Sequence, residues 1–255
     1  FPNGETLTFA YDTARRPETI KKANTNTFSQ TYDRDSNVLT EARSLTGPTG
    51  DNGTNTNTMT YDGLGRLLSE SGLGSSRTYL YDRDGNRTRK VEGGTTTVDY
   101  VYDRTDQLTK QKINGGADIT FAYDRYGNLT TNRDSAGTAT TYAYDTASHL
   151  TSITAGAQSS TFKFDALGRY RERTVNGVTE LYNYVGTSEV TSVITGATTR
   201  ISAVTEDGSR VATKDGSTSA FLIPDLHGDV AAMEQAAAVT IANAIRYDAY
   251  GQTMG

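Results

Sequence analysis

Two short acidic segments have the residue types and the spacing of a calcium-binding loop. In Asp82-Arg-Asp-Gly-Asn86 and Asp33-Arg-Asp-Ser-Asn37, side-chain oxygens occupy the first, third and fifth positions, as they do in EF-hand loops. The sixth position of such a loop requires glycine, but it holds Arg87 or Val38, and neither segment has a glutamate at the twelfth position. We therefore interpret both segments as turns and predict no metal site.

The other side chains with catalytic potential are two histidines and a large set of carboxylates. His149 falls at a polar position beside a recurring turn, which indicates a surface role. His227 stands beside Gly228 and Asp229, which indicates a turn or rim position. The carboxylates recur in so many equivalent copies that no glycosidase-like acid and base pair can be chosen. No nucleophile elbow, P-loop or dinucleotide fingerprint is present, so the sequence predicts no enzyme and no cofactor.

The composition favours a sheet with one buried face and one wet face. Hydrophobic residues make up 35% of the 255 residues and the mean hydropathy is −0.58, which is low for a sheet buried on both faces. The chain nevertheless contains 16 tyrosines and 7 phenylalanines, which is too many aromatic residues for a disordered polypeptide.

Charge and residue usage exclude several kinds of partner. A net charge of −5 and a pI near 5.1 argue against nucleic acid and against anionic membranes. The sequence has no apolar run of about 18 residues, so we predict no membrane span. The absence of cysteine excludes disulfides and thiolate metal sites. The chain opens at Phe1 without a starting methionine or a signal-like segment, so we expect a piece of a longer polypeptide.

Most of the aspartates belong to a repeat. Tyr-Asp pairs follow one another at 20 or 21 residues over most of the chain. The pairs are Tyr11-Asp12, Tyr32-Asp33, Tyr61-Asp62, Tyr81-Asp82, Tyr102-Asp103, Tyr123-Asp124, Tyr144-Asp145, the variant Phe164-Asp165, and Tyr247-Asp248. One longer interval of 29 residues contains a Gly-, Thr- and Asn-rich stretch, which predicts a long loop over about residues 46–58.

Each Tyr-Asp pair predicts a turn between two strands. The aspartate begins the turn and glycine often stands three residues later, which is the favoured chemistry of a type I turn. These glycines are Gly65, Gly85, Gly127, Gly168 and Gly251. Ser36, Asp106 and Ser148 replace glycine acceptably, whereas Arg15 is a poor fit. An aromatic residue two positions before the tyrosine places both rings on one face of a strand, and a second glycine-rich turn follows 11 to 14 residues after the tyrosine.

The repeat therefore predicts an all-β fold, a continuous antiparallel β-hairpin meander. One unit is too small to offset the entropy of its own ordering, so stability must come from contacts between neighbouring repeats. Because strands twist with a single hand, a long one-layer meander coils into a spiral sheet. We expect regular repeats over residues 1–184 and degenerate repeats of the same sheet over residues 185–255.

Several segments resemble the YD repeat of bacterial Rhs and wall-associated proteins, of C-type toxin-complex subunits and of teneurins. They include Tyr61-Asp-Gly-Leu-Gly-Arg-Leu67 and Tyr123-Asp-Arg-Tyr-Gly-Asn-Leu129. In addition, Ile223-Pro-Asp-Leu-His-Gly-Asp-Val230, followed by Arg246-Tyr-Asp-Ala-Tyr-Gly251, is similar to the end of an Rhs core. The resemblance implies a YD-repeat shell or part of one. It also implies two strands within residues 230–244, with a turn near residues 235–238, where local propensity alone favours a helix.

The resemblance implies a structural module of a secreted or surface bacterial protein. Such a module encloses or presents a C-terminal toxin or effector, so its partner is the rest of the parent polypeptide or that cargo. The Asp-Pro-x-Gly-Leu cleavage motif of some family members is absent here. Two alternatives are a module that binds glycans or a partner through exposed tyrosines, and self-assembly through open edge strands. A third, an enzyme built from carboxylates of residues 185–246, is disfavoured because Glu206-Asp-Gly208 and Lys214-Asp-Gly216 look like hairpin turns.

Overall fold

The computed structural model describes residues 6–22, 26–45, 53–72, 75–185, 189–204, 210–235, 240–247 and 253–254. These residues form strands and turns and contain no helix. Accordingly, the described part of the chain has no helix with the length and apolar character needed to cross a membrane. Strands β1 to β23 belong to one sheet, and β24 and β25 form a separate two-stranded sheet. The predicted all-β fold is therefore confirmed.

The chain divides into two compact units. Unit 1 comprises Phe1–Ser76 and Ile201–Gly255, and unit 2 comprises Arg77–Arg200. The strands of unit 1 are β1 (Leu7–Tyr11), β2 (Pro17–Lys22), β3 (Asn26–Tyr32), β4 (Val38–Leu45), β5 (Gly53–Tyr61), β6 (Leu67–Gly72), β20 (Arg210–Asp215), β21 (Thr218–Pro224), β22 (Val230–Gln235), β23 (Thr240–Ala244), β24 (Arg246–Tyr247) and β25 (Thr253–Met254).

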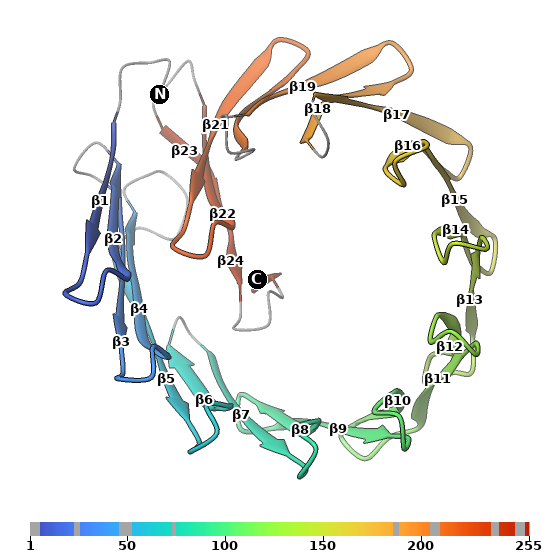
Figure 1. Cartoon of the computed structure of the whole chain (residues 1–255), viewed down its shortest axis with the longest axis horizontal. Helices are drawn as coiled ribbons and strands as arrows, with labels where there is room; N and C mark the ends of the chain where they lie inside the picture. Colours follow the sequence, from blue (N-terminus) through green and yellow to red (C-terminus); the bar gives the residue numbers. More distant parts are fainter. Residues whose placement is uncertain are drawn as a thin grey trace. The chain divides into compact units, whose positions relative to one another are not determined.

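Unit 2 is a single-layer meander. Its strands are β8 (Arg87–Glu92), β9 (Thr96–Tyr102), β10 (Leu108–Ile113), β11 (Asp118–Tyr123), β12 (Leu129–Arg133), β13 (Ala139–Tyr144), β14 (Leu150–Ala155), β15 (Gln158–Phe164), β16 (Tyr170–Val175), β17 (Val178–Val185) and β18 (Glu189–Thr195). The unit boundaries fall within β7 (Ser75–Tyr81) and β19 (Thr198–Val204). Consecutive strands of unit 2 pair antiparallel and follow a curved strip, as predicted (Figure 1).

Side chains alternate between two faces along each strand. In β15, Phe162 and Phe164 are half-buried, while the alternating residues Thr161 and Lys163 are exposed. We call the face that carries the tyrosine of each Tyr-Asp pair, and the residue two positions before it, the aromatic face. Because strand side chains have a period of two, the Tyr-Asp spacing fixes which residues lie on this face.

The long loop predicted over residues 46–58 is wrong for its second half. Residues 46–52 lie outside the described residues, but Gly53–Tyr61 form β5, which pairs with β4 over residues 53–58. The physical reason is a period of two that the polar composition hides. Asn57 and Met59 are buried, whereas Thr58 and Thr60 are exposed, so the threonines supply the wet face of a strand.

The tail forms strands and not a helix, as the family resemblance predicts. β22 pairs with β21 and β23. Of the turn predicted near residues 235–238, Gln235 belongs to β22 and residues 236–238 lie outside the described residues. The predicted hairpin turn at Gly216 joins β20 to β21, while the one at residues 206–208 also lies outside the described part. Burial of Ala232 against other strands outweighs the helix propensity of this alanine-rich segment.

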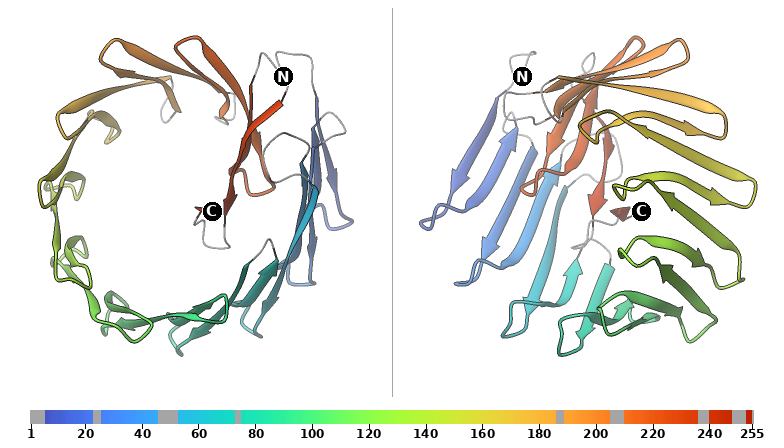
Figure 2. Two further views of the ribbon diagram at one scale, coloured as in Figure 1. Left: turned by 180° about the vertical axis from the view of Figure 1, so that it is seen from behind. Right: turned by 45° about the vertical axis from the view of Figure 1, so that its right-hand side comes forward.

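Unit 1 has a second layer. The hairpin of β21 and β22 lies on the aromatic face of β2, β3 and β4 (Figures 1 and 2). Phe28 and Leu45 from the first layer form one buried cluster with Ile223 and Ala232 from the hairpin, and Leu226 packs against it. We call this contact the seam.

Candidate functional site

The aspartate of each repeat holds its own turn with one carboxylate oxygen. In the repeat of Asp124, Oδ1 accepts hydrogen bonds from the N–H groups of Tyr126 at 2.8 Å and Asn128 at 2.9 Å. The same two bonds recur at Asp12, Asp33, Asp62, Asp82, Asp103, Asp134, Asp145, Asp165 and Asp225. The carboxylates of the periodic aspartates are thus engaged in hydrogen bonds from backbone N–H groups.

The third residue after the aspartate, which we call the corner, has a left-handed backbone. Its φ ranges from 59° at Asp106 to 96° at Gly85. The corners are Arg15, Ser36, Gly65, Gly85, Asp106, Gly127, Ser148 and Gly168, all with positive φ. A type I turn followed by a left-handed residue gives a G1 bulge, and the strand register indeed shifts at each tyrosine. Arg15 is therefore the poor fit that the sequence predicts.

In the two segments that resemble an EF-hand loop, the leading aspartate is hydrogen bonded within its own turn. Asp82 Oδ1 accepts N–H groups from Asp84 and Asn86, and Oδ2 accepts the Asn86 side-chain amide at 3.2 Å. Hydrogen-bond donors directed at both oxygens would repel a cation. Among the described residues, no three acidic, histidine or cysteine side chains are grouped as metal ligands.

The same bonds lower the pKa of the aspartates in the Tyr-Asp pairs from Asp12 to Asp145, and that of Asp165. At Asp12 the backbone N–H of Arg16 is the main cause, and at Asp33 it is the side-chain amide of Asn37. A carboxyl with a lowered folded pKa contributes stability above its ordinary pKa and loses it as the pH falls through the folded value. The turns are therefore held at neutral pH and weaken in acid.

Six tyrosines along the repeat array donate a hydrogen bond to the repeat before their own. Tyr123 donates its hydroxyl to the carbonyl oxygen of Leu108 at 2.9 Å, five residues after the preceding turn aspartate. Equivalent bonds join Tyr32 to Pro17, Tyr61 to Val38, Tyr102 to Arg87, Tyr144 to Leu129 and Tyr184 to Tyr170. Phe164 has no hydroxyl, and its ring instead stacks on His149 at 4.6 Å.

The fourth residue after the aspartate, which we call the slot, connects neighbouring turns. Arg16 lies 4.4 Å over the ring of Tyr32, and Arg169 lies at the same distance over Tyr184. The slots are Arg16, Asn37, Arg66, Asn86, Gln107, Asn128, His149 and Arg169. His149 is hydrogen bonded to Asp145 at 3.0 Å and is partly exposed.

The remaining predicted repeat residues differ in their surroundings. Tyr11 is exposed, whereas Tyr81 is half-buried. Tyr247 lies in β24, and Asp248 and Gly251 lie outside the described residues.

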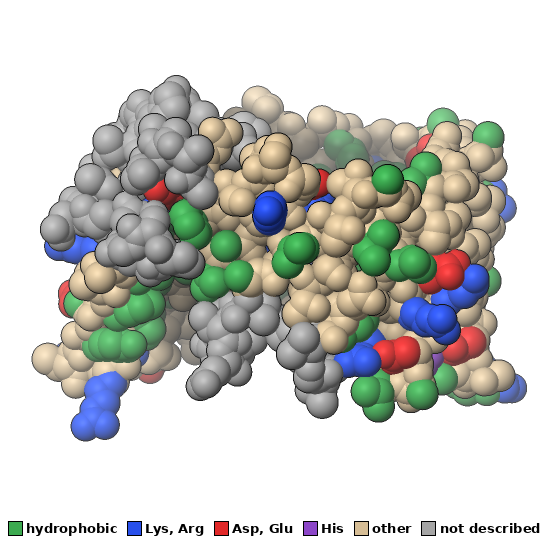
Figure 3. Space-filling view, turned by 90° about the horizontal axis from the view of Figure 1, so that it is seen from above, with side chains coloured by type: hydrophobic (Ala, Val, Ile, Leu, Met, Phe, Trp, Pro, Cys, Tyr) green, Lys and Arg blue, Asp and Glu red, His purple; other side chains and the backbone are tan. Residues whose placement is uncertain are grey.

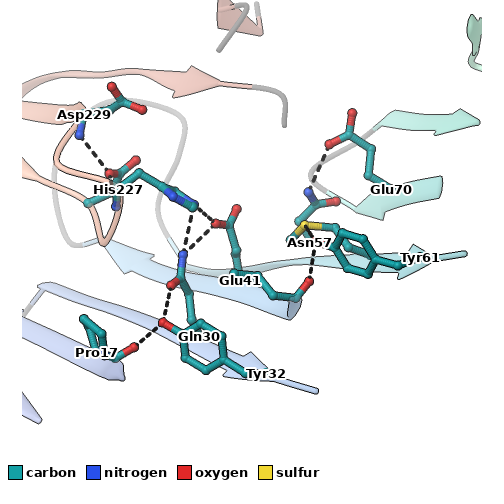
Figure 4. Close-up of polar contacts among 12 residues, drawn as sticks. Pro17, Gln30, Tyr32, Glu41, Asn57, Tyr61, Glu70, His227 and Asp229 are labelled. Atoms are coloured by element: carbon teal, nitrogen blue, oxygen red, sulfur yellow. Dashed lines mark hydrogen bonds and ion pairs between the residues drawn. The ribbon is translucent and has the colours of Figure 1, made fainter. Parts of the chain in front are cut away.

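The seam in unit 1 brings together charged residues that the repeat does not explain. Lys22 of β2 forms an ion pair with Glu234 of β22, with side chains only 2% and 3% exposed. Glu41 Oε1 accepts hydrogen bonds from Gln30 Nε2 at 2.8 Å and from Nε2 of His227 (Figure 4). Gln30 in turn accepts the Tyr32 hydroxyl at 2.9 Å.

A turn or rim position was predicted for His227, but its contacts with Glu41 and Gln30 were not. The signal that was available is Gln30, which occupies the position two residues before a repeat tyrosine where an aromatic residue usually stands. Lys22 and Glu234 carry no such signal, because surface strands commonly contain charged residues.

The His227 and Glu41 pair is electrostatically coupled. The hydrogen bond that His227 donates to Glu41, followed by the charge of Glu41, raises the pKa of His227 against the opposing effect of burial. Burial alone would raise the pKa of Glu41, but the hydrogen bond and charge of His227 lower it. The other charged groups near His227 are Asp225 and Asp229 of its own turn, and burial raises the pKa of Asp225.

We expect Arg15→Gly to stabilise unit 1 by about 0.5–1 kcal/mol, because it removes a left-handed non-glycine residue. The matched control is Ser148→Gly, which removes similar strain but also loses the hydrogen bond from Asn128. That variant should stay within about 0.5 kcal/mol of the parent chain. Urea unfolding followed by hydrogen exchange of each turn measures both, and a destabilised Arg15→Gly would contradict the strain argument.

We expect the seam to weaken as the pH rises from about 6 to about 9. A raised histidine pKa gives stability that is complete below the ordinary value and is lost as the pH rises through the folded value. The urea midpoint of unit 1 should fall over this range, and Glu41→Gln should flatten the fall. Glu172→Gln, in the exposed Lys163–Glu172 pair, is the control; an unchanged slope in Glu41→Gln would refute the coupling.

Glu234→Leu should destabilise the seam by roughly 3–5 kcal/mol, because it takes the carboxylate away from a buried ammonium group. The double variant Lys22→Met, Glu234→Leu should recover most of this loss, since buried ion pairs are often replaceable by apolar residues. Native-state hydrogen exchange of β22 amides measures the opening free energy. A double variant no better than the single one would show that the two side chains act independently.

Comparison with known proteins places the repeat in a family. The model of the teneurin YD-shell family matches residues 48–254. The crystal structure of TcdB2-TccC3-Cdc42 is similar with a TM-score of 0.62 and 17% identity, over 98% of this chain and 15% of that chain. The structure of TcdB2-TccC3 without the hypervariable C-terminal region is similar with a TM-score of 0.61 and 15% identity, over the same shares. No curated protein matches.

This chain thus spans about 15% of the length of the solved chains that it resembles. At such low identity those structures bear on the fold, and they agree with the hairpin meander described above. The family match covers far more than half of the sequence and includes the Tyr-Asp turns from Tyr61 onward. The protein belongs to the teneurin YD-shell family.

Proposed function

We propose that this chain is a wall module of a shell, and that its aromatic face holds a polypeptide cargo such as a C-terminal toxin or effector. The shell assignment follows from the family. The proposal of a cargo rests on one observation: among the described residues, the aromatic face is covered by a second layer in unit 1 but not in unit 2.

In unit 1 a layer of polypeptide already covers part of the aromatic face. The β21–β22 hairpin contributes Ile223 and Ala232 to a buried cluster with Phe28 and Leu45. Polar groups beside the cluster are paired across the layers, as in the contact between Glu41 and His227. This face can therefore bind an extended polypeptide through apolar and polar groups together.

In unit 2 the equivalent face is buried at its start, at Tyr79 and Val98, and half-buried from Tyr100 onward. Its aromatic residues Tyr100, Phe121, Tyr142 and Phe162 are all of intermediate exposure. Polar groups are interspersed: Tyr142 donates its hydroxyl to Asn132 at 3.0 Å. Within unit 2, no described strand lies over this face. A mixed surface of this kind suits an unfolded chain, which presents apolar side chains and unpaired peptide groups at once.

The rest of the surface agrees with a scaffold. On the side seen in Figure 3, apolar side chains occur in small groups between polar and charged ones. The periodic carboxylates are held by their own turns, so we propose that the module itself catalyses no reaction. We further propose that the parent polypeptide is secreted from a bacterial cell or displayed on its surface.

A permanently unfolded protein, reduced and alkylated, tests the cargo proposal. We expect it to bind the full chain and to slow hydrogen exchange in β9–β17. Phe121→Ser and Phe162→Ser should each weaken binding several-fold because they remove apolar area from the aromatic face. Val101→Ser, at an exposed position of the opposite face, is the matched control and should leave binding unchanged.

Binding that is lost equally in all three variants, or no binding at all, would overturn the cargo proposal. A panel of neutral and acidic glycans is tested in parallel. Saturable glycan binding without polypeptide binding would favour the alternative of a carbohydrate-binding module that uses exposed tyrosines.

A further inference from the structure

Slot and corner residues of successive repeats meet in pairs. Asn128 Nδ2 donates to Ser148 Oγ at 3.1 Å, and Asn86 Nδ2 donates to Asp106 Oδ1 at 2.8 Å. In each case the slot residue of one repeat bonds the corner residue of the next. Arg16 does the same to Ser36 at 3.2 Å. A corner that is not glycine is therefore matched by a donor in the preceding slot.

Three glycine corners, Gly65, Gly127 and Gly168, lie close to the slot side chain of the preceding repeat, whereas Gly85 has open space around it. A Cβ added at Gly168 would lie 3.1 Å from His149 Nε2, and one added at Gly127 would lie 3.3 Å from Gln107 Nε2. At Gly65 the nearest atom would be Asn37 Oδ1 at 3.6 Å. In that repeat the Asn37 amide nitrogen bonds Asp33, so its oxygen faces the next corner.

One corner has no such neighbour. Within the described residues, β1 pairs only with β2, which leaves the other edge of β1 open. Phe9 and Tyr11 on this strand are 53% and 59% exposed, whereas the other repeat tyrosines in the described pairs are half-buried. The Arg15 side chain is exposed and makes no hydrogen bond or ion pair among the described residues.

We propose that the edge of β1 is a docking surface for one further Tyr-Asp hairpin, and that Arg15 selects a hairpin with an amide side chain in its slot. The interface would continue the one that joins every pair of neighbouring repeats. The docked strand would offer a carbonyl oxygen to the Tyr11 hydroxyl, and its slot residue would lie beside Arg15. The inference is independent of the cargo proposal, because it concerns the strand edge and not the aromatic face.

The choice of an amide follows from the two neighbours of a slot. The slot must donate to the aspartate of its own turn, as Asn128 does to Asp124 at 3.0 Å, so a carboxylate there would be repelled. It must also accept from the guanidinium of Arg15, so arginine or lysine there would be repelled. Asparagine satisfies both, with its nitrogen on the aspartate and its oxygen toward the corner, as Asn37 is oriented.

The test replaces residues 1–5 with one additional repeat. A copy of residues 118–138 is joined directly before residue 6, which sets its Tyr-Asp pair 21 residues ahead of Tyr11, the spacing of the native repeats. Four variants are compared. The added repeat carries either Asn128 or Asn128→Arg in its slot, and each version is combined with either Arg15 or Arg15→Ser in the original first repeat. Hydrogen exchange of Leu7–Tyr11 reports docking, because the open edge of β1 becomes hydrogen bonded.

We expect the asparagine copy to protect β1 about two- to fivefold better than the arginine copy when Arg15 is present. With Arg15→Ser the order should reverse or vanish, since an arginine slot then faces serine as Arg16 faces Ser36. Exchange of β1 equal to that of the unextended chain would overturn the docking surface. Equal protection by both copies with Arg15 present would overturn the selection by Arg15.

Discussion

The architecture depends on one local interaction, the aspartate carboxylate that accepts two N–H groups of its own turn. It holds a type I turn with a left-handed corner, and this geometry inserts a bulge opposite each repeat tyrosine. Because side chains alternate along a strand, a slip of one residue would turn every ring to the other face. The aspartate therefore fixes the register of the strands and, through it, the identity of the aromatic face.

Turn order alone would leave the hairpins independent of one another. The tyrosine hydroxyl and the slot side chain join each repeat to its neighbour, as Tyr123 does to Leu108 and Asn128 to Ser148. Both links reach one repeat and no further, so stability spreads by nearest-neighbour contacts. These contacts explain how unit 2 stays ordered although its aromatic residues are half-buried. They also explain why β1, which has one open edge among the described residues, keeps an exposed Tyr11 and an exposed Arg15.

Most of the fold could be predicted because its determinants are local and repeated. The strands, the turns and the shared face of the rings all follow from the Tyr-Asp spacing, and Arg15 was recognised as a strained corner. The loop expected over residues 53–58 was wrong because alternating threonines and asparagines look like loop composition. The seam could not be predicted, because it joins Glu41 to His227 across 186 positions of sequence. Only the polar Gln30 at an aromatic position marked one side of it.

The seam also shows how a repetitive surface can be bound in one place. The ion pairs alone would allow the hairpin to bind in two registers. Arg43 lies at the same repeat position as Lys22, ten residues after a turn aspartate. Glu70 likewise lies at the same repeat position as Glu41, eight residues after a turn aspartate. The apolar contact separates the two, since the residue equivalent to Phe28 in the next repeat is Asn57. A hairpin shifted by one repeat would keep its charges matched but would bury Ile223 against an amide, at the cost of desolvating that amide. Buried charges therefore orient the hairpin, and a single aromatic residue selects the strands on which it rests.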